Sequence, residues 1–282
     1  MCTNICGIFI YLLSFSHALN DMSQGPKKGV IRIFKLLWSI EERSPSIFFQ
    51  LFDAQIQPML SYGAEVWGLD VDTTLIERIH LFALKRFLNT ILRTPNVMVY
   101  GETGRYPFFV NIYVKCIQFW LRILKMSPHR LPFKAYRMLL HLHEQNKKTW
   151  ASSVCYVLYK YDFGEVWVNQ GVENETAFLQ EFMERVLSLY RQDWENNLRT
   201  KERYSVYSTF QLSLSLSTYL IELKHVKARN FLIRLRQGVS ALKTHKLRYC
   251  KAVTLVDYFC PFCVGDVESG VHFIFVSKIC RD

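Results

Sequence analysis

A candidate metal site lies near the C-terminal end of the sequence. Cys260 and Cys263 are separated by two residues, with Pro261 in the turn, and His272 follows after a gap of eight residues. Zinc takes four soft or borderline ligands in a tetrahedron, and a Cys-x2-Cys turn presents two thiolates to one ion. Cys280, after seven further residues, is available as the fourth ligand. From spacing alone two interpretations stay open: a zinc site, or two incidental thiols near a partly buried histidine.

A basic segment precedes these cysteines. Residues 224–251 carry nine Lys or Arg and no acid, in a 282-residue chain whose formal net charge is +11. Such a concentration of charge favours an acidic partner, with RNA or DNA the first candidate, and no membrane partner is expected. Eight of these residues are predicted to contact backbone phosphates: Lys224, Lys227, Arg229, Arg234, Arg236, Lys243, Lys246 and Arg248. The alternative is an ordinary solvated helix face.

The first half of this segment has the pattern of a helix over residues 224–237, ended by Gly238. Its apolar residues are predicted to share the face that docks on the protein: Ala228, Phe231, Leu232 and Leu235. Arg229 and Arg236 are expected to flank this face on one side, with the other cations on the opposite side. Such a helix could dock on the protein and still present its cations to phosphates.

No arrangement of catalytic residues is recognisable in the sequence. Two-metal chemistry needs convergent carboxylates, and the only close aspartate pair is Asp70 and Asp72. These follow Gly68 and precede a predicted helix, where turn formation and capping explain them. The chain has no GxxxxGK[ST] phosphate loop and no GxSxG motif. We therefore predict that it is not an enzyme.

The elements that must position these residues are mainly helices. Apolar residues at helical spacing predict helices near 44–59, 74–87, 108–126, 133–146, 149–161, 178–198 and 224–237. Pro58 is expected to kink or end the first of these, and Thr74-x-x-Glu77 has the form of a capping box. The glycines and proline of residues 100–107 predict a loop. Residues 213–220 alternate polar and apolar side chains as a strand does, or begin a helix.

The N-terminal segment and the cysteines bear on the cellular compartment. Residues 6–15 form an apolar run of signal-peptide length, but no Lys or Arg precedes them and they are too short to span a bilayer. We therefore favour a buried strand over a secretory signal. The eight cysteines are irregularly spaced and form no disulfide framework. The expected location is the nucleus or the cytoplasm.

Several motifs in the chain resemble, in the same order, the region that follows the polymerase palm in LINE-type (non-LTR) retrotransposon reverse transcriptases. The segment "LFDAQIQPMLSYGAEVWG" (51–68) resembles a helix that leads there into P-x-L-x-YG-x-E-x-W. The later motifs are "IERIHLFALKRFL" (76–88), "VYGETGRYPF" (99–108), "FLIRLRQG" (231–238) and "CPFC…VHFIF" (260–275). The resemblance covers roughly residues 14–280.

This resemblance implies the C-terminal part of such a polyprotein, which grips RNA and target DNA in that family. The family's polymerase aspartates and its endonuclease would lie upstream, so the resemblance also implies no catalysis by this chain. It implies a zinc knuckle as well, usually of the form Cys-x2-Cys…His-x4-Cys. Cys260, Cys263 and His272 match this pattern, whereas Ser277 stands at the fourth position. Because a hydroxyl is a poor zinc ligand, we expect weakened zinc affinity unless Cys280 completes the site.

The expected architecture is therefore a mainly α fold with four parts. Residues 1–24 are an N-terminal segment, either a palm remnant or fortuitous; 25–161 form a thumb-like helical bundle; 162–250 form a second helical region with the basic segment; and 251–282 form a degenerate, CCHC-like zinc knuckle. The connection at 162–175 is the expected domain boundary.

The function expected from these features is non-catalytic binding of RNA or DNA, with zinc as the cofactor. The alternative is a structural or protein-interaction protein, or a transposon relic with no selected function. Thumb helices without a palm would leave apolar surface exposed, which could recruit a partner or cause aggregation.

Overall fold

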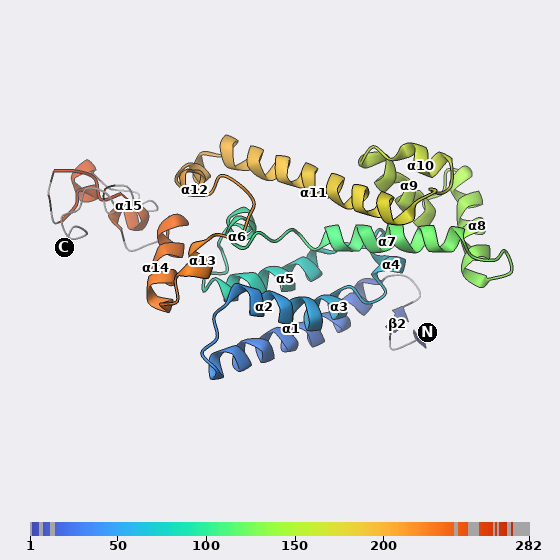
Figure 1. Cartoon of the computed structure of the whole chain (residues 1–282), viewed down its shortest axis with the longest axis horizontal. Coiled ribbons are helices and arrows are strands. Elements are labelled where there is room, and N and C mark those ends of the chain that lie inside the picture. The colour runs from blue at the N-terminus through green and yellow to red at the C-terminus, as the bar shows by residue number, and fades with distance from the viewer. Residues whose placement is uncertain are drawn as a thin grey trace. The chain divides into compact units, whose positions relative to one another are not determined.

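The computed structural model of the chain is mainly helical (Figure 1). It describes residues 2–5, 8–11, 15–239, 242–247, 254–261, 263, 265–269 and 272. The elements are β1 (Cys2–Ile5), β2 (Ile8–Tyr11), α1 (Phe15–Ser39), α2 (Pro45–Leu51), the π-helix η1 (Phe52–Ile56), α3 (Gln57–Leu60), α4 (Ala64–Trp67), α5 (Thr74–Phe87), α6 (Asn96–Thr103), α7 (Phe109–Leu124), α8 (Leu131–Glu144), α9 (Trp150–Lys160), α10 (Gly164–Val168), α11 (Glu175–Thr200), the 3-10 helix η2 (Glu202–Tyr204), α12 (Ser205–Phe210), α13 (Tyr219–Glu222), α14 (Val226–Arg236), α15 (Lys243–Lys246) and the 3-10 helix η4 (Leu255–Tyr258).

The chain divides into two compact units, and both are discontinuous in sequence. The first unit comprises residues 1–83 and 106–193, and the second comprises 84–105 and 194–282. Two of the three boundaries fall inside helices, one in α5 and one in α11, and the third, after residue 105, lies between α6 and α7. The boundary expected at 162–175 is therefore wrong, because that connection lies wholly within the first unit.

The N-terminal half of the first unit is built around α1. Its buried residues Val30, Ile33, Phe34 and Leu37 recur at helical spacing and make one apolar face. That face packs against α2, η1 and α3, and the rings of Phe34 and Phe48 lie 5.2 Å apart. Before α1 in the sequence, β1 and β2 form an antiparallel pair in which Cys2 is opposite Tyr11. Within residues 6–15, predicted to form a buried strand, a strand is present at Ile8–Tyr11, and the burial of its side chains lies outside what the structure describes.

The interruption expected at Pro58 is confirmed and takes the form of a π-helical turn. Proline has no N–H to donate to the carbonyl four residues back, and its ring would clash with that carbonyl. The helix widens ahead of it in η1, where the N–H of Gln57 donates to the Phe52 carbonyl, five residues earlier. The chain thereby passes Pro58 and continues as α3.

The start of α5 is capped differently from the capping box that the sequence predicts. Asp72 accepts hydrogen bonds from both the N–H and the hydroxyl of Thr74, which confirms the capping role expected for the aspartate pair at Asp72 alone, since Asp70 accepts from the hydroxyl of Ser153. Glu77 does not turn back to the helix start. Its Oε2 instead accepts from the N–H of Phe108 at 2.6 Å, and its Oε1 lies 3.1 Å from Nδ1 of His80. A long-range hydrogen bond from Phe108 thus engages the carboxylate that the sequence assigns to the capping box.

The rest of the first unit packs around α7, with α8, α9 and α10 beside one another as Figure 1 shows. Trp120 of α7 is fully buried and stacks on Trp167 of α10, with ring centroids 5.8 Å apart. Phe178 and Phe182 of α11 belong to the same core. The predicted boundary failed because Trp167 within it and Phe178 and Phe182 beyond it share one core with Trp120.

Candidate metal centre and basic surface

The second unit is organised around a buried ion pair between α6 and α14. Nε of Arg236 donates to Oε1 of Glu102 at 2.9 Å, and the two side chains are 11% and 0% exposed. The other carboxylate oxygen, Oε2, accepts from the hydroxyls of Ser217 at 2.8 Å and Tyr219 at 2.7 Å. A second nitrogen of Arg236 donates to Oε1 of Gln211 at 2.5 Å. Buried charges need such partners to offset the loss of water.

The helix that carries Glu102 was predicted to be a loop. Residues 100–103 instead belong to α6, and the chain turns at Gly104, whose φ of 63° is left-handed. Position 101 of this helix is a glycine because neighbouring side chains leave no room for a Cβ. A Cβ at that position would lie 2.5 Å from Oη of Tyr207 and 2.7 Å from Cζ2 of Trp194. Tertiary packing, not local turn preference, therefore decides the conformation of this segment.

The helix α14 begins and ends as the sequence predicts. His225 is its N-cap and accepts from the N–H of Ala228, and Gly238 follows its end with a φ of 68°. The predicted docking face is confirmed at Leu235 but wrong at Ala228 and Phe231. Ala228 and Phe231 are exposed, whereas Arg229, Ile233 and Leu235 are buried.

Two of the predicted phosphate-binding arginines are consequently part of the fold. Arg229 is 5% exposed, its guanidinium lies 5.3 Å from the ring centre of Phe87, and it donates to the Leu220 carbonyl at 3.4 Å. Arg236 is occupied by Glu102 and lies 5.2 Å from the ring centre of Tyr219. The aliphatic stem and planar head of arginine let it pack among aromatic rings, which helical periodicity alone does not anticipate.

The remaining predicted cations have different surroundings. Lys224, Lys227 and Arg234 are exposed, and the structure gives them no acidic partner among the residues it describes. Lys243 is partly buried, and its backbone N–H donates to Oε2 of Glu268 at 3.0 Å. The Lys246 side chain and the whole of Arg248 lie outside what the structure describes.

Three of the four predicted metal ligands are close together. One ligand atom each from Cys260, Cys263 and His272 lies within 4.8 Å of the other two, close enough to hold a metal ion. Sγ of Cys263 is 3.3 Å from Nε2 of His272. A zinc ion about 2.3 Å from sulfur and about 2.0 Å from nitrogen, at a tetrahedral angle, would separate these atoms by about 3.5 Å. The fourth predicted ligand, Cys280, lies outside the described residues, as does Ser277.

The backbone around the two cysteines forms a turn that positions them. Phe259 and Val267 make an antiparallel bridge, and the N–H of Cys260 donates to the Asp266 carbonyl at 2.8 Å. Cys260 is buried and Cys263 is exposed. The N–H of Gly265 donates to the Cys263 sulfur and is the largest cause of the lowered pKa of that thiol. A lowered pKa favours the thiolate, which is the form that binds metal.

His272 has the surroundings of a metal-binding imidazole. The residue is 5% exposed, and its Nδ1 has no hydrogen-bond partner. The carboxylate oxygen Oδ2 of Asp266 lies 3.8 Å from Nδ1, which is too far for a hydrogen bond. It is nevertheless beside the ring nitrogen that does not face Cys263. Metal-binding histidines usually donate their second N–H to such a group. The three residues therefore fit zinc in both donor type and surroundings.

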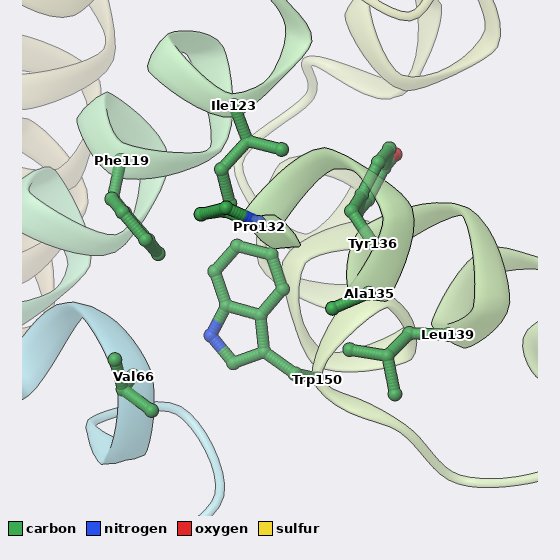
Figure 2. Close-up of a pocket in the computed structure, with 8 residues that line it drawn as sticks. All are labelled: Val66, Phe119, Ile123, Pro132, Ala135, Tyr136, Leu139 and Trp150. Atoms are coloured by element: carbon green, nitrogen blue, oxygen red, sulfur yellow. The ribbon is translucent and has the colours of Figure 1, made fainter. Parts of the chain in front are cut away.

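The first unit also contains an apolar pocket of about 220 Å³. Figure 2 shows the Trp150 indole at its centre, with Ile123 and Pro132 on one side and Val66 near the indole nitrogen. The polar atoms of its lining are already paired. Trp150 Nε1 donates to the Glu65 carbonyl at 3.1 Å, and the Tyr136 hydroxyl donates to Gln170 and accepts from Trp120. The pocket can accept apolar groups but has no free polar atom among these to orient them.

Comparison of the chain with protein-family models, with curated proteins and with solved structures gives no match. Among the described residues, no helix is both long enough and apolar enough to cross a membrane.

Glu102, the residue at the centre of the second unit, was not predicted from the sequence. A glutamate inside the run "VMVYGETG" is the signal that could have identified it, because a lone acid among apolar residues needs a buried cationic partner. The identity of that partner, Arg236, could not be read from the sequence.

Proposed function

We propose that the chain is a non-catalytic nucleic-acid-binding module, related to the C-terminal part of LINE-type reverse transcriptases. The observation that carries this proposal is the set of exposed cations Lys224, Lys227 and Arg234, called here the α14 cations. Lys227 and Arg234 lie on α14, and Lys224 lies two residues before it, in a segment without any acid; the opposite side of α14 is held to the protein by Arg229 and Arg236. Unneutralised cations on a fixed helix bind backbone phosphates without reading base sequence.

The metal ion of the proposed module is zinc, held by Cys260, Cys263, His272 and a fourth ligand. Its role is to hold the C-terminal turn in place beside the basic segment. The carboxylate of Glu268, one residue beyond the bridge at Val267, accepts from the N–H of Lys243, and its carbonyl accepts from the Thr244 hydroxyl at 2.9 Å. Bound zinc supplies a cross-link there and no chemistry.

The test is a comparison of two triple variants of equal charge change. The first is Lys224→Ala/Lys227→Ala/Arg234→Ala. The control is Arg185→Ala/Arg191→Ala/Arg199→Ala, whose cations already pair with Asp162, Glu184 and Glu195. Binding to a labelled RNA hairpin and to duplex DNA is measured as a function of salt.

Loss of three phosphate contacts should reduce the slope of log K against log salt by up to about 2.7 on duplex DNA, at about 0.9 for each contact. The control should keep the slope of the unmodified protein. Equal slopes for the two triple variants would contradict the proposal. Arg229 and Arg236 are unsuitable for this test, because replacing either would damage the fold.

A protein-interaction role is the alternative, and exposed apolar side chains favour it. Leu92, Leu131 and Leu212 are 73%, 80% and 81% exposed. They belong to separate stretches of the chain, on a loop, on α8 and on another loop. Binding to a partner through such residues would be insensitive to salt, so the salt titration separates the two functions.

A further inference from the structure

The chain contains a second basic segment, which the net charge alone conceals. Residues 103–143 contain seven Lys or Arg and no Asp or Glu. The concentration of acids in residues 162–202 offsets this charge in the total, so only the segment after residue 224 is conspicuous. In the structure, this second segment runs from the end of α6 to near the end of α8 and lies mostly in the first unit.

Three of these cations form a row that begins at Arg130, the N-cap of α8, and continues along the helix. Arg130, Lys134 and Arg137 are spaced by four and three residues, so they lie on one face of the helix, and all three are exposed. At a rise of 1.5 Å per residue the row is about 10 Å long. We call it the α8 row.

The opposite side of α8 is fixed to the protein. Pro132, Ala135, Tyr136 and Leu139 line the apolar pocket shown in Figure 2. Tyr136 is 2% exposed, and its hydroxyl is held by Trp120 and Gln170. The helix is therefore rigidly placed, and its row of cations points away from the pocket.

The α8 row is not neutralised by the protein. The only acid on the helix, Glu144, lies 3.5 Å from His141, and the preceding Lys125 pairs with Glu175 at 3.1 Å. Among the described residues, no carboxylate lies within ion-pair distance of Arg130, Lys134 or Arg137. Three adjacent unpaired cations repel one another by a small amount, which a bound polyanion would relieve.

We propose that the α8 row is a second phosphate-binding surface for the nucleic-acid backbone. It shares its class of ligand with the proposed function but does not depend on the α14 cations. The row offers only positively charged groups, so it should bind without regard to base sequence.

A membrane surface is the other large polyanion, and the packing of α8 disfavours it. A helix that lies in a membrane interface inserts a broad apolar face into the lipid. On α8, Tyr136 is buried, whereas the large apolar side chains of Leu131 and Met138 are 80% and 60% exposed. Two such side chains make a narrower apolar face than insertion into lipid needs, so the cations fit a phosphate backbone better than a bilayer.

The test uses the variant Arg130→Gln/Lys134→Gln/Arg137→Gln of the full chain, with duplex DNA and an RNA hairpin as probes. Glutamine keeps the helix and removes the charge. We expect the slope of log K against log salt to fall by up to about 2.7 on duplex DNA. The charge-conserving variant Arg130→Lys/Lys134→Arg/Arg137→Lys should keep the slope, and so should the control Arg185→Ala/Arg191→Ala/Arg199→Ala.

Three results would overturn the inference. The first is an unchanged slope for the glutamine variant. The second is an equal loss of slope in the α11 control, which would show that only net charge matters. The third is loss of binding to vesicles of anionic phospholipid with unchanged binding to DNA and RNA. The α14 variant is measured in parallel to separate the two proposals. If the slope changes only in the α14 variant, the α8 surface is refuted and the proposed function still stands.

Discussion

Arg236 donates from Nε to Oε1 of Glu102 across 2.9 Å, and the two residues are 134 positions apart in the chain. They belong to two of the sequence motifs, "VYGETGRYPF" and "FLIRLRQG". Their buried contact gives these motifs a structural role in the second unit. It also explains why an arginine predicted to bind phosphate is directed inward.

A double-mutant cycle tests this pair. Glu102→Gln or Arg236→Met alone should each destabilise the protein by about 3–5 kcal/mol, because the remaining charge is buried without its partner. The double variant should lose clearly less than the sum of the two. Urea unfolding of the four proteins measures this coupling. Additive losses would show that the two side chains do not stabilise one another.

Gly101→Ala should destabilise the protein, although alanine is the better helix former by about 1 kcal/mol. The new Cβ would lie 2.5 Å from Oη of Tyr207 and 2.7 Å from Cζ2 of Trp194. Such overpacking costs about 1–3 kcal/mol. Removing the nearer obstacle with Tyr207→Phe should make the alanine substitution less harmful than it is in the unmodified protein. Thermal unfolding checks this, and a stabilising Gly101→Ala would refute the close packing of α6.

Several buried tyrosines should make the protein less stable at alkaline pH. Burial raises the pKa of Tyr161 to about 12, and burial with the nearby charge of Glu102 raises the pKa of Tyr219 further. Above a pH of about 10 the unfolded chain loses these protons while the folded chain keeps them, so unfolding is increasingly favoured as pH rises. The urea midpoint should fall above this pH. Titration of all 15 tyrosines near pH 10 in the native protein would contradict the expectation.

Zinc should protect two cysteines from alkylation. In zinc-loaded protein Cys260 and Cys263 should react slowly, and a chelator should make them reactive, because the bound thiolates are released. Cys116 is the internal control and should be unreactive in both states, since burial raises its pKa to about 12. Mass spectrometry after labelling reads each site separately. His272→Ala should abolish the protection, and identical labelling with and without chelator would exclude a metal at these residues.

Much of the fold could be predicted from the sequence, because most helices are marked by local signals. Apolar spacing predicted α7, α8, α9, α11 and α14, and Gly238 marked the end of the last of these. Apolar spacing could not predict α6. There the close packing of Trp194 and Tyr207 against Gly101 requires a glycine inside a helix.

The candidate site was predictable only in part. The Cys-x2-Cys spacing identified Cys260, Cys263 and His272, which the structure places together. The basic helix was identified as well, but not its orientation, because Arg229 packs on Phe87 and Arg236 pairs with Glu102, both distant in sequence. The α8 row was overlooked because net charge is a sum, and the acids of residues 162–202 cancel it.

The most direct test of the central claim is the salt dependence of binding by the unmodified protein to duplex DNA. We expect log K to fall linearly with log salt, with a slope steeper than about −2.7, the value for three phosphate contacts. A slope near zero, or no binding at low salt, would contradict the claim that exposed cations of this chain bind the nucleic-acid backbone.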